Sequence, residues 1–163
     1  MKQAASVQIA APRDCSAEDL DEFKRLVREG GEVNLNTFDG LVPGALALAF
    51  VRWHGELAAV GALKNPNLGY RSKVFTKAKV DNPDHYSYEL GWMIVREPYR
   101  GRKLSSLAVA SLVSSLGGQS AYATSRTDNH AMHVAMKNAG FVTVGNAYAS
   151  DRRNASMRLF IRN

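Results

Sequence analysis

The chain is poor in cysteine and in long apolar runs. Cys15 is the only cysteine among 163 residues, so no disulfide within the chain and no thiolate metal site is expected. The longest apolar run, residues 41–51, contains proline and glycine and is too short to cross a bilayer. The first residues, MKQAASVQIAAP, lack the apolar core of a secretory signal. We therefore expect a cytoplasmic protein without a membrane partner or a metal.

The length and the charge limit the possible functions. A chain of this length fits one domain, which we expect to span residues 1–163. Lys and Arg number 21 against 15 Asp and Glu, which gives a net charge of +6. Such a surplus favours anionic partners, such as phosphates or nucleic acid. Surface solubility explains it equally well.

Hydrophobic periodicity predicts alternating strands and helices. In chain order these are a strand at 7–10, a helix opened by Ser16, a hairpin turning at 54–56, a short helix near 72–79, a long strand in HYSYELGWMIV, a helix over 104–116, a strand AYATSR, a helix capped by Asp128 or Asn129, and antiparallel strands at 141–148 and 156–161. This order predicts an α/β protein, in which a mixed sheet carries helices on both faces.

The run HYSYELGWMIV is the most sheet-like segment of the chain. Simple alternation along an extended strand gives it two faces. One face is predicted to carry Tyr86, Tyr88, Leu90, Trp92 and Ile94, and the other Ser87, Glu89, Gly91, Met93 and Val95. Pro98 ends the strand.

The segment VREPYRGRKLSSLAVASLV leads from this strand through a basic turn into a helix. A helix N-terminus offers free N–H groups and a partial positive charge, which suit an anion. Gly101 permits close approach of a ligand, and Ser105 and Ser106 add hydroxyls. The turn matches neither a P-loop nor a dinucleotide-binding fingerprint. It predicts a pyrophosphate site, with a merely basic polar turn as the alternative.

Two segments, YELGWMIVREPYRGRKLS and SRTDNHAMHVAMKNAGF, follow a helix and a hairpin in the chain. In this order they resemble the GCN5-related N-acetyltransferases, over roughly residues 45–148. The loop of that family reads Arg/Gln-x-x-Gly-x-Gly/Ala. Arg100 and Gly101 match it, whereas Lys103 stands at the second glycine and Ser105 at the last small position. The resemblance implies a mixed, mostly antiparallel sheet of six to seven strands with helices on both faces.

The resemblance also implies an activity, which is transfer of an acetyl group from acetyl-CoA to a primary amine by direct attack, with coenzyme A as product. The acceptor would be a small molecule or a protein. By position, Met93, Ile94 and Val95 would pair with the pantetheine amides, Arg100, Gly101, Arg102, Lys103, Leu104 and Ser105 would hold the pyrophosphate, and Asn129 would contact the pantetheine arm. Glu89 is the candidate general base. The alternative is a structural glutamate that neighbouring groups satisfy.

The chain departs from the family pattern at two positions. The tyrosine that often reprotonates the leaving thiolate is replaced by Met136. Tyr148 or Ser125 could supply the proton instead, or CoA could leave as thiolate. Lys103 could also close the site, which would make the chain a non-catalytic relative.

The acceptor is left open by the sequence. In KNPNLGYRSKVFTKAK, Tyr70 and Phe75 alternate with basic residues, a pattern that can hold RNA. An acceptor carried on nucleic acid, such as aminoacyl-tRNA, is therefore an alternative, although a lid over the acceptor cleft explains the segment more simply. We expect acceptor specificity from residues 34–41, residues 65–83 and the last hairpin. A monomer and a homodimer are both possible.

Overall fold

The computed structural model describes residues 4–152 and 154–163. Seven strands form one open sheet in the order β1-β2-β3-β4-β5-β7-β6. The strands are β1 (Ala5–Ala10), β2 (Ala47–Trp53), β3 (Glu56–Lys64), β4 (Tyr88–Val95), β5 (Ala121–Arg126), β6 (Val142–Ala149) and β7 (Ser156–Arg162). All neighbours are antiparallel except β4 and β5, which run parallel. The predicted mixed, mostly antiparallel sheet is confirmed.

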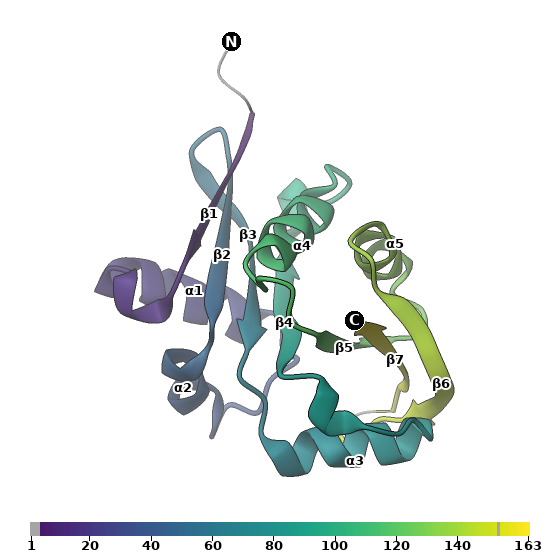
Figure 1. Cartoon of the computed structure of the whole chain (residues 1–163). Coiled ribbons are helices and arrows are strands. Elements are labelled where there is room, and N and C mark those ends of the chain that lie inside the picture. The colour runs from purple at the N-terminus through teal and green to yellow at the C-terminus, as the bar shows by residue number, and fades with distance from the viewer. Residues whose placement is uncertain (1–3, 153) are drawn as a thin grey trace.

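Helices cover both faces of this sheet. They are α1 (Ala17–Glu29), α2 (Phe38–Leu41), α3 (Leu68–Ala78), α4 (Leu104–Ser114) and α5 (His130–Asn138). Figure 1 shows α4 and α5 together over one face and α3 across the lower end of the sheet. None of the helices in the described part of the chain is both long and apolar enough to cross a membrane.

Side-chain caps fix where three of these helices begin. Ser16 accepts a hydrogen bond from the Asp19 N–H at 3.1 Å, as its position before α1 predicts. Asn129, rather than Asp128, caps α5 and accepts from Met132 at 3.3 Å. Asn67 caps α3, so this helix covers residues 68–78 and begins four residues before the predicted start. The sequence analysis did not use this asparagine as a start signal.

The apolar core differs between the two faces. On one face, α4 and α5 pack on a continuous cluster that includes Leu63, Leu90 and Ala123. On the other face the core is divided. One part lies under α1 and α2 against β2 and β3, and a second part lies under α3 against β5 and β7. The polar side chains of β4 and β5 lie between these two parts.

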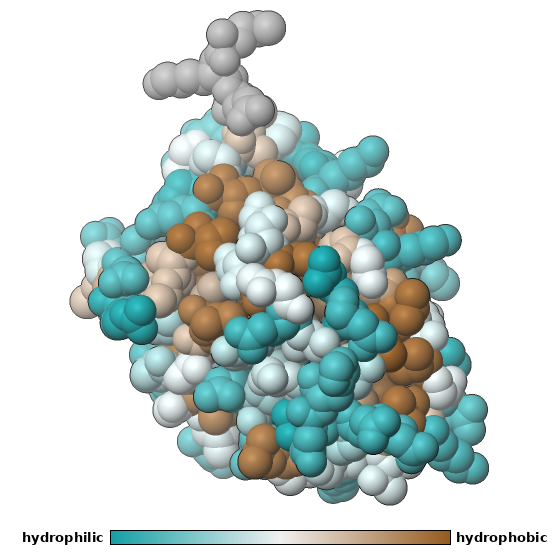
Figure 2. Space-filling view, viewed as in Figure 1, coloured by the Kyte–Doolittle hydropathy of each residue, from teal (hydrophilic) through white to brown (hydrophobic). Residues whose placement is uncertain are grey.

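The outer strand β6 forms one margin of the sheet. Figure 2, viewed as in Figure 1, shows apolar side chains along this margin, and Val142 is 56% exposed. An exposed edge strand can pair with another chain. The choice between monomer and homodimer therefore stays open.

A β-bulge at Trp92 corrects the predicted faces of the long strand. Ala62 pairs with Gly91 and Val60 with Ile94, so Trp92 and Met93 stand opposite the single residue Gly61. The extra residue reverses the alternation. Leu90 packs in the α4–α5 cluster, whereas Trp92 and Ile94 pack with α1. The prediction of one shared face for these residues is wrong, because alternation alone carries no signal for a bulge.

Candidate active site

Strands β4 and β5 separate half-way along their length. They pair only over Tyr88–Leu90 and Ala121–Ala123 within the described residues. Residues 91–95 of β4 are only partly buried, whereas residues 59–63 of β3 beside them are buried. The β4 backbone from Gly91 to Val95 therefore faces a gap instead of a neighbouring strand. Backbone groups at such an edge are available to an extended ligand that carries amides.

The loop before α4 forms a backbone cradle next to this gap. Gly101 and Lys103 both take the left-handed conformation, with φ of +79° and +60°. Among the described side chains, none caps the N-terminus of α4, so the N–H groups of its first turn have no intrahelical partner and no cap. Left-handed residues in such a turn direct successive N–H groups to one point, which makes an anion-binding concavity.

Lys103 keeps the backbone shape that a glycine would give. A left-handed conformation costs a residue with a side chain about 1–2 kcal/mol. Strain of this kind persists where the surrounding structure enforces it, often at functional sites. The Lys103 side chain itself is exposed.

The basic side chains of this loop are held at its rim. The Arg100 Nε donates to the Val95 carbonyl at 3.4 Å. The Arg102 guanidinium lies 4.8 Å from the centre of the Trp53 ring. Leu104 is buried, so it can contribute to a ligand only through its backbone. Arg100 and Arg102 thus contact the end of β4 and the end of β2, and their role at a pyrophosphate stays a prediction.

The predicted cofactor residues meet at one edge of the sheet. Met93 to Val95 end β4, and residues 100–105 lead into α4. Asn129 begins α5, directly after β5. Because β4 and β5 are parallel, the helices that follow them begin at the same edge. The Asn129 side-chain oxygen is already used as the α5 cap.

Glu89 lies on the face opposite α4 and α5 and is 4% exposed. Its Oε1 is 3.3 Å from the Lys64 Nζ, and its Oε2 accepts from the Tyr122 hydroxyl at 3.1 Å. The same Lys64 Nζ lies 5.1 Å from the centre of the Trp92 ring, at the bulge. Both carboxylate oxygens of Glu89 thus have partners, next to the point where β4 leaves β5.

Three tyrosines surround Glu89 and remain protonated at neutral pH. Burial of its hydroxyl, together with the charge of Glu89, raises the pKa of Tyr70 to about 12, although a hydrogen bond with Thr124 acts in the opposite direction. Burial first, and the Glu89 charge in addition, also raise the pKa of Tyr122 and of Tyr148. These hydroxyls therefore serve as hydrogen-bond donors. Tyr148 is one of the two expected proton donors.

The position of the missing tyrosine and the second candidate proton donor, Ser125, are both buried. Met136 is fully buried and carries no proton to donate. Ser125 is 5% exposed, and its hydroxyl donates to the Arg126 carbonyl at 3.4 Å.

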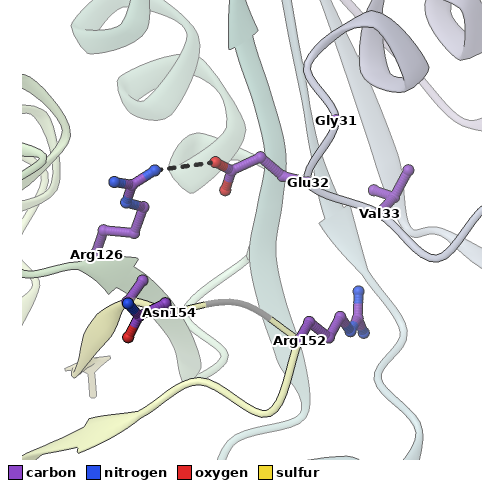
Figure 3. A pocket seen from close by; sticks show the side chains of 7 residues that line it. Gly31, Glu32, Val33, Arg126, Arg152 and Asn154 are labelled. Carbon is purple, nitrogen blue, oxygen red and sulfur yellow. Dashed lines mark ion pairs between the residues drawn. The ribbon is translucent and has the colours of Figure 1, made fainter.

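An open pocket of about 400 Å³ lies at the C-terminal end of β5. Its lining comes from the loop after α1, from Arg126 and from the loop between β6 and β7: Gly31, Glu32, Val33, Arg126, Arg152, Asn154 and Ala155. Figure 3 shows Glu32 and Arg126 facing one another across it, with Nη1 and Oε1 3.8 Å apart.

The β6–β7 loop is tied to α3. Asp151 pairs with Lys73 at 2.7 Å and also with Lys77. Hydrogen bonds from these two lysines lower the pKa of the exposed Asp151 to about 2. These contacts hold the loop that carries Arg152 beside the pocket.

Solved structures match this arrangement over almost the whole chain. Escherichia coli ElaA is 17% identical, with a TM-score of 0.69, over 98% of this chain and 99% of its own. Arabidopsis thaliana Naa50, in complex with the bisubstrate analogue CoA-Ac-MVNAL, is 13% identical, with a TM-score of 0.67, over 99% of each chain. The chain has the fold of the GCN5-related N-acetyltransferases.

A third structure with this fold is yncA, a putative acetyltransferase from Salmonella typhimurium with its cofactor acetyl-CoA. It is 12% identical, with a TM-score of 0.58, and the match covers 98% of this chain and 93% of that one. No family model and no curated protein matches the sequence. At these identities the similarity to the N-acetyltransferases rests on the fold.

The features that suggested an RNA-borne acceptor have other roles in this acetyltransferase fold. Phe75 is buried in the core under α3 and cannot stack on a base. Arg71 is 5% exposed and donates to the Tyr86 carbonyl and to Asp84. Lys73 and Lys77 pair with Asp151. Residues 68–78 form α3, which packs against β6 and β7, and a lid over an acceptor cleft stays a prediction.

Sequence analysis did not assign several residues of this site to it. Tyr122, Thr124 and Arg126 occupy alternate positions on β5, so they share the face that carries Glu89. That alternation is visible in AYATSR and could have identified them. Lys64 was read only as part of a basic segment, because nothing local pairs it with Glu89.

Proposed function

We propose that the chain is an acetyl-CoA-dependent N-acetyltransferase that acts on a primary amine of a small molecule or a protein. The observation that carries the proposal is the separation of β4 from β5 directly beside the left-handed cradle at Gly101 and Lys103. The open strand edge suits a pantetheine arm with two amides, and the cradle suits its pyrophosphate. The related folds with CoA-type ligands support this choice of cofactor.

Each part of the site has a proposed role. Residues 93–95 would hold the pantetheine arm by their backbone, the cradle from Arg100 to Ser105 would hold the pyrophosphate, and Asn129 would contact the arm from α5. When bound, acetyl-CoA supplies a thioester whose C–S bond breaks as a C–N bond to the acceptor forms. The acceptor amine must lose a proton in the same process.

Glu89 is the proposed general base. Glu89, Tyr122 and Arg126 share one face of the sheet, so an amine bound in the open pocket lies on the same face as Glu89. The Lys64 ammonium pairs with its carboxylate and the Tyr122 hydroxyl donates to it, which fixes its orientation. The distance along the sheet between the open pocket and Glu89 makes proton transfer through water the natural route. The tyrosine hydroxyls nearby can order that water.

Thermal unfolding with and without excess acetyl-CoA tests the cofactor. A ligand at about 100 times its Kd adds about 2.7 kcal/mol to the unfolding free energy, so a clear rise in midpoint is expected. Gly101→Trp should abolish the rise. Gly117→Trp is the matched control, because Gly117 also has a positive φ and open space but lies beyond the far end of α4. An equal rise in both variants, or none in the wild type, would contradict the proposal.

Release of free CoA in the presence of a panel of amines tests catalysis. Glu89→Gln should lower the turnover by about 100-fold or more while the rise in midpoint with acetyl-CoA persists. Binding without release for every amine would identify a non-catalytic CoA-binding protein.

A further inference from the structure

An arginine pair characterises the open pocket at the end of β5. Arg126 is the last residue of β5, and Arg152 stands on the facing loop between β6 and β7. Asn154 adds an amide to the same lining, in which two arginines stand against the single glutamate Glu32. Guanidinium groups donate only, and the amide adds two further donors. The pocket therefore favours a ligand with a negatively charged group that accepts hydrogen bonds.

The strand register places this pair level with the open part of β4. Glu89 stands opposite Tyr122 on the parallel strand β5. Arg126 is four residues beyond Tyr122, about 13 Å along the strand. Met93, at the bulge, is also four residues beyond Glu89. Arg126 and the bulge therefore both lie beyond the paired part of the two strands, where β4 and β5 separate.

The contact with Glu32 indicates that Arg126 can bind a carboxylate. Its carboxylate reaches across the pocket to Arg126, as Figure 3 shows. The distance of 3.8 Å is longer than a hydrogen bond, and both side chains are almost half exposed, so this pair is weak. Asp128 lies 3.4 Å from both Nε and Nη2 of Arg126, so Nη1 is the part of this guanidinium that faces Glu32. A small carboxylate could replace Glu32 there with a short charge-assisted hydrogen bond to Nη1, and Arg152 could bind its second oxygen.

We propose that the acceptor is a free amino acid or a similarly small amine with a carboxylate next to its amino group, and that Arg126 and Arg152 bind this carboxylate. The inference rests on the proposed function and names its acceptor class. A pocket of about 400 Å³ accommodates a ligand of this size. In the transfer, the amino nitrogen bonds to the acetyl carbon, the C–S bond breaks, the nitrogen gives up one proton, and sulfur leaves as the CoA thiol. The carboxylate takes no part beyond binding.

Matched acceptor pairs test the carboxylate. The standard L-amino acids and their C-terminal amides differ only in this group. Amidation makes the neighbouring amine less basic, so amine reactivity alone favours the amides at neutral pH. We expect the reverse: the preferred amino acid should exceed its amide in kcat/KM by about 10- to 100-fold, as for a hydrogen-bonded charged group. Equal or better use of the amides would overturn the inference.

Substitution of the two arginines tests whether they bind the carboxylate of the acceptor. Arg126→Gln and Arg152→Gln should each raise the KM for the amino acid by about tenfold or more, with the KM for acetyl-CoA and the activity toward the amide unchanged. Arg25→Gln is the matched control, because Arg25 is an exposed arginine of α1 outside the pocket. If the variants lower activity toward the amino acid and its amide equally, the two arginines have a structural role and the inference is wrong.

A binding measurement separates this inference from the proposed function. Ligand-observed NMR with the same amino acids and amides needs no acetyl-CoA. Binding of the amino acid, lost in Arg126→Gln and absent for the amide, would support the carboxylate site even in a protein that shows no response to acetyl-CoA. A response to acetyl-CoA, together with equal binding of acid and amide, would keep the proposed function and reject the carboxylate site.

Discussion

The Lys64 ammonium and the Glu89 carboxylate form an ion pair of 3.3 Å across β3 and β4, with the glutamate almost fully buried. The pair lies in register, since Lys64 and Glu89 are direct neighbours on the two strands. Removing one partner of a buried pair leaves an uncompensated charge. Lys64 is thus a positioning residue for the proposed base.

Replacement of this lysine tests the coupling. Lys64→Met should lower kcat by about tenfold or more and leave the KM for acetyl-CoA unchanged, because the buried carboxylate loses the partner that holds its orientation. Lys64→Arg, which keeps the charge, should restore most of the activity. A kcat in Lys64→Met equal to that of the wild type would show that the pair serves only stability.

The left-handed backbone at Lys103 predicts how the cradle tolerates substitution. Lys103→Gly relieves strain of about 1 kcal/mol but adds a similar entropy cost in the unfolded chain, so the unfolding free energy should change little. Acetyl-CoA should still raise the midpoint. Lys103→Ile places a β-branched residue at this φ, and both stability and the acetyl-CoA response should fall. Denaturant titrations with and without acetyl-CoA measure both effects, and equal behaviour of the two variants would contradict the role of the backbone.

The raised pKa of Tyr70 predicts a loss of stability in alkali. The unfolded tyrosine has a pKa of about 10, whereas the folded value is about 12. Below pH 10 both states keep the proton, and the contribution to stability is fully present. As the pH rises from about 10 to about 12, only the unfolded state ionises, so the contribution is lost. In urea titrations across this range, the unfolding free energy should fall less steeply with pH in Tyr70→Phe than in the wild type. An unchanged slope would argue against the raised pKa of Tyr70.

Two glycines with positive φ should respond differently to alanine. Gly145, in the irregular part of β6, has φ of +67°, and a Cβ there would overlap the Ala78 carbonyl at the end of α3. Gly101 has open space around the same position. Gly101→Ala should cost about 1 kcal/mol in unfolding free energy from conformation alone, and Gly145→Ala about 2 kcal/mol or more, since backbone must move. Similar costs in denaturant titrations would contradict the close approach of β6 to α3.

The order of elements and the mixed sheet could be predicted because they depend on local signals. Ser16 as a cap, the hairpin and the Gly101 turn each carry their information within a few residues. The left-handed conformation of Lys103 was not visible, since no local pattern requires it of lysine.

The open pocket, which is the proposed acceptor site, could be predicted only in part, because distant residues build it. The last hairpin, which carries Arg152, was expected to contribute, whereas Glu32 lies outside the expected residues 34–41. Glu32, Arg126 and Arg152 come from three parts of the chain and meet only in the folded sheet. The bulge at Trp92 depends on how β4 pairs with β3, and the alternation of residues along β4 alone does not indicate this register. Phe75 looked available for stacking because a basic helix pattern does not reveal which face is buried.

The position of β7 between β5 and β6 also determines when the sheet can be completed during synthesis. Domains generally fold as units as the chain leaves the ribosome. Here β6 emerges before the strand to which it pairs, so it has to wait for β7. A nascent chain stalled before β7 would therefore lack the strand that joins β6 to β5, and its sheet would end at β5.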